Sequence, residues 1–72
     1  MLTYELWIMV VGGDDDKERR IYKGIKAGLM AAIQDHAEEV DNDMDAYFEL
    51  IAPDWNYTFS RSADLMDHIT RH

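Results

Sequence analysis

Hydrophobic and polar positions alternate over residues 2–11, LTYELWIMVV, and this alternation predicts the first β-strand. One face is apolar throughout and consists of Leu2, Tyr4, Leu6, Ile8 and Val10. The second face begins polar and becomes apolar along Thr3, Glu5, Trp7, Met9 and Val11. Because both faces are apolar near its C-terminal end, this strand is expected inside a sheet or with a partner on its second face.

Helical periodicity dominates residues 17–40, KERRIYKGIKAGLMAAIQDHAEEV, and predicts one long helix. Its apolar stripe consists of Ile21, Ile25, Leu29, Ala32, Ile33 and Val40. Gly12-Gly13 ends the preceding strand, and Asp14 to Asp16 place caps and negative charge at the helix N-terminus. At a rise of about 1.5 Å per residue the helix would be roughly 36 Å long, so part of it is expected to extend beyond a small sheet.

Residues 47–52 and 55–59 are rich in strand formers and predict a hairpin with its turn at Pro53-Asp54. A short helix capped by Asp43 is the alternative for the first of these segments, on the spacing of Met44, Tyr47, Phe48 and Ile51. The strand is favoured over it. From Ser62 onward, a serine cap and an early acid predict a short amphipathic helix with the apolar residues Leu65, Met66 and Ile69.

The predicted fold class is therefore α+β, with a single small domain over residues 1–72 in the order β-α-β-β-α. Its three-stranded sheet, antiparallel or mixed, has the long helix packed across one face, and a short C-terminal helix ends the chain. The connection from the first strand through the long helix to the second strand is compatible with a right-handed parallel crossover.

Composition limits the functions that this chain can have: it has 72 residues, no cysteine and a formal net charge of -8. A domain of this size buries only about 60% of its unfolded surface and has no disulfide to stabilise it, so a homodimer is one hypothesis. The negative charge repels phosphates and predicts no direct nucleic-acid binding. Glu5 interrupts the N-terminal apolar run and no stretch is long enough to span a bilayer, so no membrane association is expected and the predicted location is cytoplasmic.

Small residues form a ridge beside the apolar stripe of the predicted helix: Gly24, Ala27, Gly28 and Ala31. Each glycine inside a helix costs about 1 kcal/mol relative to alanine, so close approach of another backbone is expected to offset that cost. The ridge packs against the domain's own sheet or second helix, or it forms the contact of a homodimer. The G-x-x-x-G spacing also occurs in pairs of membrane helices, but a helix this charged excludes that use.

Charge is segregated along the predicted helix, because five of the chain's seven basic residues are Lys17, Arg19, Arg20, Lys23 and Lys26. Acidic residues follow at its end and in the next turn: Asp35, Glu38, Glu39, Asp41, Asp43 and Asp45. The aspartates of residues 41–45 have the spacing of a calcium loop, but Ala46 and Ala52 stand where its glycine and glutamate would be. We therefore interpret the acidic residues as a surface for a basic partner, and the charge gradient as a solvated face or a dipole suited to self-pairing.

No catalytic constellation is evident in the sequence, and the chain is predicted not to be an enzyme. Cysteine is absent, the C-terminal serines and threonines have no Gly-rich elbow around them, and a small domain has little room for a pocket. His36 lies in the apolar stripe as a packed histidine or a pH-sensitive contact. His68 and His72 are spaced i, i+4, but no third ligand is evident, so neither a metal nor a cofactor is predicted.

The leading functional prediction is a small acidic protein-interaction module that binds and occludes a macromolecular partner with a basic surface. Its acidic surface imitates a polyanion, and Trp7 and Trp55 are the predicted aromatic anchors. Very small, acidic, cysteine-free domains are common among phage-encoded inhibitors, antitoxins and accessory proteins, a similarity of type that gives no residue a role. The alternatives are a structural homo-oligomer built on the long helix and a divalent-metal or small-molecule binding domain.

Overall fold

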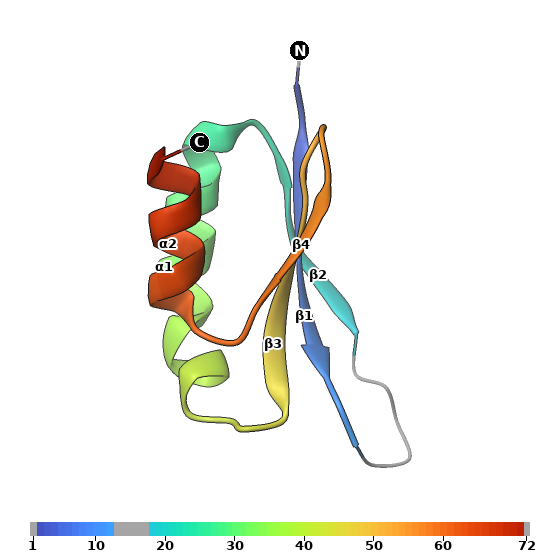
Figure 1. Cartoon of the computed structure of the whole chain (residues 1–72), viewed down its shortest axis with the longest axis vertical. Coiled ribbons are helices and arrows are strands. Elements are labelled where there is room, and N and C mark those ends of the chain that lie inside the picture. The colour runs from blue at the N-terminus through green and yellow to red at the C-terminus, as the bar shows by residue number, and fades with distance from the viewer. Residues whose placement is uncertain (1, 13–17, 72) are drawn as a thin grey trace.

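The chain forms two β-hairpins, each followed by a helix, in the computed structural model that describes residues 2–12 and 18–71 (Figure 1). Its elements are β1 (Tyr4–Val10), β2 (Arg19–Gly24), the 3-10 helix η1 (Lys26–Gly28), α1 (Leu29–Asp41), β3 (Ala46–Ile51), β4 (Asn56–Phe59) and α2 (Ser62–Arg71). The predicted α+β class is confirmed. The predicted order β-α-β-β-α and the three-stranded sheet are wrong, because a further strand precedes α1.

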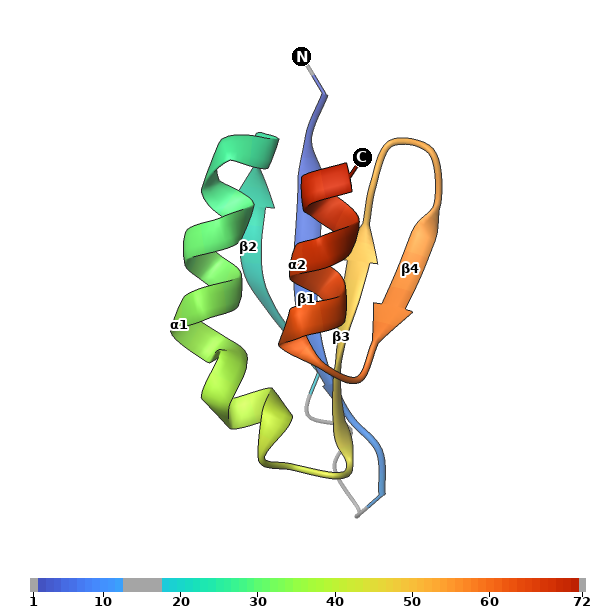
Figure 2. The ribbon, with the colours of Figure 1, turned by 60° about the vertical axis from the view of Figure 1, so that its left-hand side comes forward.

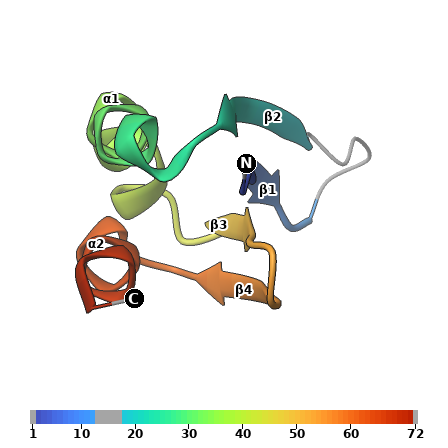
Figure 3. The same cartoon turned by 90° about the horizontal axis from the view of Figure 1, so that it is seen from above.

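The four strands form one antiparallel sheet in the order β2-β1-β3-β4. Both helices cover the same face of this sheet, with α1 nearer β2 and α2 nearer β4 (Figure 3). The predicted interior position of the first strand is confirmed, because β1 lies between β2 and β3. The predicted parallel crossover is wrong, because β1 and β3 pair antiparallel from Glu5↔Ile51 to Val10↔Ala46.

Within the predicted helix over residues 17–40, residues 19–24 instead form the edge strand β2, and residue 17 lies outside the described residues. It pairs with β1 from Tyr4↔Gly24 to Ile8↔Arg19, with a register shift between Leu6 and Trp7. This pairing, together with that of β1 and β3, gives β1 a hydrogen-bonding neighbour on each edge. Glycine is unfavourable in a helix interior, and here Gly24 ends β2 while Gly28 ends η1 just before α1. The predicted cap at Asp14 to Asp16 lies outside the described residues.

The second half of the predicted long helix is confirmed as α1, whose buried residues are Leu29, Ala32, Ile33 and Val40. At about 1.5 Å per residue, a helix of this length matches a short sheet, so the predicted overhang is absent from the described residues. Ile25, assigned to the apolar stripe, precedes η1 and is 46% exposed. The i, i+4 spacing from Ile21 to Ile25 and Leu29 therefore spans a strand and a helix and does not mark one helical face.

The predicted hairpin and C-terminal helix are confirmed as β3, β4 and α2. β3 is a strand and not the alternative helix, because Phe48 pairs with Phe59 across the hairpin and Leu50 with Tyr57. The turn is closed by a hydrogen bond from the Ala52 N–H to the Trp55 carbonyl at 3.0 Å.

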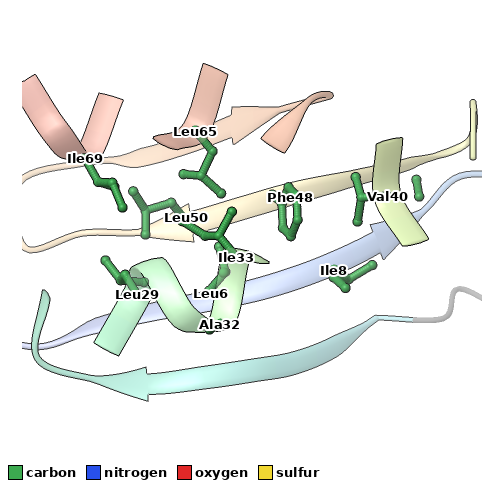
Figure 4. Close-up of a cluster of buried hydrophobic side chains, with 11 residues drawn as sticks. Leu6, Ile8, Leu29, Ala32, Ile33, Val40, Phe48, Leu50, Leu65 and Ile69 are labelled. Carbon is green, nitrogen blue, oxygen red and sulfur yellow. The ribbon is translucent and has the colours of Figure 1, made fainter. Parts of the chain in front are cut away.

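The core lies between the sheet and the two helices (Figure 4). Its buried residues are all apolar: Leu6, Ile8, Leu29, Ala32, Ile33, Val40, Ala46, Phe48, Leu50, Leu65 and Ile69. Even-numbered residues of β1 and β3 face the helices because successive side chains of a strand point to opposite faces. The odd-numbered residues of both central strands consequently point away from the core. No helix in the described part of the chain is long and apolar enough to cross a membrane.

Candidate functional site

The face of the sheet opposite the helices has no covering element among the described residues (Figure 3). Its centre consists of three cross-strand pairs of β1 and β3: Glu5 with Ile51, Trp7 with Glu49, and Met9 with Tyr47. These six side chains, which we call the open face, are all half-buried. Apolar side chains on a sheet face that lacks a second layer are a candidate binding surface.

Trp7 occupies the middle of the open face. Its cross-strand neighbours are Arg20 on β2 and Glu49 on β3. The indole Nε1–H donates a hydrogen bond to Glu5 Oε1 at 3.1 Å, and the same oxygen lies 3.5 Å from Arg20 Nη1. The indole is therefore held in place before any partner arrives, which lowers the entropy lost on binding.

Charges on the open face alternate around the indole. Glu5 and Glu49 lie beside Trp7 on the central strands, and β2 adds the basic side chains of Arg20 and Lys23. A partner must therefore place positive charge near the two carboxylates and keep it away from the β2 edge. Basic side chains on an edge strand also discourage edge-to-edge pairing between sheets.

Four of the six residues of the predicted acidic surface belong to α1, which covers the face of the sheet opposite the open face (Figure 3). Asp35, Glu38 and Glu39 are exposed on α1. The remaining three are exposed at the end of α1 and in the connection to β3: Asp41, Asp43 and Asp45. The structure therefore does not bring the acidic residues of α1 and Trp7 together on one surface.

The carboxylates of three of the six acidic residues, Glu39, Asp41 and Asp43, form ion pairs or hydrogen bonds within the chain. Glu39 forms an ion pair with Arg19, which joins α1 to β2. Asp43 Oδ1 accepts a hydrogen bond from the Asp45 N–H at 2.9 Å and so shapes the turn into β3. These contacts give the carboxylates a structural role that their sequence spacing does not reveal.

Asp41 joins the end of α1 to the start of α2. Its carboxylate accepts hydrogen bonds from the Ser62 hydroxyl at 2.6 Å and from the Ser62 N–H at 2.8 Å. These bonds, with a smaller contribution from the charge of Arg61, lower the pKa of Asp41. The predicted helix start at Ser62 is confirmed, but the serine hydroxyl donates to Asp41.

Trp55, the second predicted anchor, lies in the turn between β3 and β4 and is 69% exposed. It does not belong to the open face. An exposed tryptophan at a turn has few neighbours that fix its ring, so it is less preorganised than Trp7.

The predicted ridge of small residues does not exist as a helical surface. Gly24 ends β2, Ala27 and Gly28 belong to η1, and Ala31 lies in α1. The close approach comes from Tyr22, because a Cβ added to Gly24 would lie 2.8 Å from the Tyr22 hydroxyl and one added to Gly28 would lie 2.7 Å from its ring. The glycines therefore make room for a tyrosine of the same chain, which removes the argument for a homodimer along this ridge.

Histidine and carboxylate side chains do not converge on a metal site in residues 2–12 and 18–71. His36 Nδ1 lies 3.0 Å from the Ala32 carbonyl, within hydrogen-bonding distance of the preceding helical turn. The His68 ring packs 4.3 Å from Tyr57 and 5.4 Å from Phe59, measured between ring centres. His72 and Asp14 to Asp16 lie outside the described residues.

Only part of the open face can be predicted from the sequence, because its residues come from two strands and the register between those strands must be known. Trp7 was predicted, whereas Met9, Tyr47 and Glu49 were not. The signal that identifies them is the alternation over residues 47–51, in which the odd positions oppose the buried Phe48 and Leu50.

Comparison of the chain with protein-family models, curated proteins and solved structures finds no match.

Proposed function

We propose that this chain is a protein-interaction module whose open face binds a basic segment of a partner protein and occludes it. One observation carries the proposal: Trp7 lies at the centre of a sheet face that no described element covers. Tryptophan is enriched at the energetic centre of protein interfaces, where it fills a well-packed and water-free position. Met9, Tyr47 and Ile51 surround it with apolar area that a partner would remove from water.

A basic partner fits the charges beside the indole. An arginine side chain of the partner can stack on Trp7 and donate hydrogen bonds to Glu5 or Glu49, which combines a cation–π contact with a charge-assisted hydrogen bond. The net charge of -8 attracts such a partner over a longer range, and the acidic residues of α1 contribute to that field. The proposed role is therefore that of a cytoplasmic inhibitor that covers a basic, polyanion-binding surface of its target.

The proposal is tested by affinity capture from a lysate of the source cells, with the immobilised chain and its Trp7→Ser variant. Trp55→Ser is the matched control, because it removes a tryptophan that lies outside the open face. We expect a basic protein to be retained by the wild type and by Trp55→Ser and to be lost from Trp7→Ser. Its retention should fall between about 50 mM and about 500 mM salt, because surface charge attraction is screened over this range.

Equal recovery on the wild type and on Trp7→Ser would show that the open face is not the binding surface. Retention that is independent of salt would contradict the electrostatic part of the proposal. Self-association through the open face is the competing outcome, and it is recognised by a solution mass of twice the chain mass that Trp7→Ser returns to the single-chain value.

A further inference from the structure

A pocket of about 270 Å³ is lined by residues from the segment before β1, from η1, from the β3–β4 turn and from the end of α2. These segments lie at the same end of the molecule (Figures 1 and 2). The apolar lining of the pocket includes Leu50 and Ile69, which are only 1% and 5% exposed. Tyr4 and Tyr57 also line it, and Lys26, Asp54 and His68 add the polar groups. The pocket lies on the helix side of the sheet and shares no residue with the open face.

The wall of the pocket is held by contacts within the chain. The Tyr57 hydroxyl donates a hydrogen bond to Asp54 Oδ2 at 2.8 Å, and this bond raises the pKa of Tyr57. The Tyr57 ring packs on the His68 ring, with 4.3 Å between their centres. The Asp54 carboxylate therefore already accepts a hydrogen bond from within the chain. The packed rings of Tyr57 and His68 hold this wall of the pocket without a ligand.

The Lys26 side chain has no ion pair or hydrogen bond with any residue that the structure describes. Arg19, Arg20 and Arg71 each pair with a carboxylate. A half-buried lysine without a partner is notable in a chain with 15 acidic and 7 basic residues. Its ammonium group beside a buried apolar lining gives the pocket one cationic end and one apolar end.

We propose that this pocket binds a small monocarboxylate with an apolar body, such as an aryl-alkanoate. The carboxylate pairs with Lys26, and the apolar body lies against Leu50 and Ile69. The volume is slightly below the range of about 300–1,000 Å³ that is typical of ligand pockets, which limits the ligand to about ten non-hydrogen atoms. A single negative charge is favoured over a phosphate because the chain itself carries a net charge of -8.

The test is an NMR titration of the isotope-labelled chain with 3-phenylpropionate. We expect saturable shifts at pocket residues such as Ala52 and Ile69, with a dissociation constant of about 0.1–1 mM for so small a ligand. Lys26→Met should weaken binding by about tenfold, because it removes a charge-assisted contact. Lys23→Met is the matched control: it removes the same charge from the other face of the sheet and should leave the affinity unchanged.

Ligand analogues test the same idea without altering the protein. The neutral alcohol 3-phenylpropan-1-ol should bind more weakly than the acid, and 2-phenylethylamine more weakly still. The proposal is overturned if the acid gives no saturable shift, if Lys26→Met binds as well as Lys23→Met, or if the amine binds best, since Asp54 would then set the specificity.

Discussion

Adjacent residues of β3 provide the sharpest test of which sheet face is covered. Phe48 points into the core and is 0% exposed, whereas Tyr47 lies on the open face. A Phe→Ala change at a fully buried position costs about 3–5 kcal/mol, as lost transfer free energy plus a cavity. A domain of this length has a total stability of roughly 4–11 kcal/mol, so Phe48→Ala should remove a large part of it.

Tyr47→Ala is the matched control, because it truncates an aromatic side chain at the neighbouring position of the same strand. Its cost should be about 1 kcal/mol or less, since the ring leaves a solvent-facing surface and only strand propensity and cross-strand packing are lost. Urea unfolding of both variants, followed by tryptophan fluorescence, measures the difference directly. In thermal unfolding, Phe48→Ala should lower the midpoint by at least about 12 °C, because 1 kcal/mol corresponds to about 4–8 °C here.

Equal destabilisation by Phe48→Ala and Tyr47→Ala would refute this reasoning. It would mean that the open face is packed against another part of the protein, and the argument for a partner there would fail. A larger destabilisation by Tyr47→Ala than by Phe48→Ala would mean that the face carrying Tyr47, and not the face carrying Phe48, is the buried one.

Two further substitutions test contacts within the fold. Asp41→Asn should lower the free energy of unfolding at neutral pH by about 0.5–1.5 kcal/mol, because it weakens the hydrogen bonds to Ser62. Because folding lowers the pKa of Asp41, its contribution is present above the unfolded value of 3.8 and is lost as the pH falls through the folded value. Urea unfolding over a pH series should therefore show the two proteins converging below about pH 4, and a constant difference would contradict the assignment. Gly28→Ala should destabilise the wild type by about 1 kcal/mol, because the Tyr22 ring must move and its hydroxyl loses the hydrogen bond to the Ile25 carbonyl. In a Tyr22→Ala background the same change should be neutral or stabilising, and an equal effect in both backgrounds would show that Tyr22 is not the reason for the glycine.

The elements predicted correctly are those whose patterns are local. Residues 4–10 alternate, the segment 46–59 has strand formers around Pro53-Asp54, and Ser62 precedes an amphipathic run. Each pattern lies within one element, so its period identifies the element without knowledge of the rest of the fold.

The long helix was predicted wrongly because its pattern crosses an element boundary. Ile21 belongs to β2 and Leu29 to α1, and their spacing matches a helical period only by coincidence. The glycines at 24 and 28 argue against a continuous helix, and in the fold they make room for Tyr22 and form no packing ridge. Pairing of β2 with β1 is a non-local contact, and the local sequence gives no direct signal for it.

The candidate site was predictable only through Trp7. Its position on the second face of the first strand followed from alternation, whereas its neighbours depend on the register with β3 and β2. The acidic residues were correctly predicted to be exposed, but Asp41 and Glu39 have partners that are distant in sequence, Ser62 and Arg19.

We propose that the open face, and not the acidic side of α1, contacts the partner. The most direct measurement is an NMR footprint of the captured partner on the isotope-labelled chain. We predict that the largest shifts occur at the Trp7 indole N–H and at Met9 and Ile51. Trp7→Ser should weaken binding by about 30-fold or more, the effect of an interface hot spot. Shifts confined to Asp35 and Glu38 on α1, with the Trp7 indole unchanged, would contradict the account.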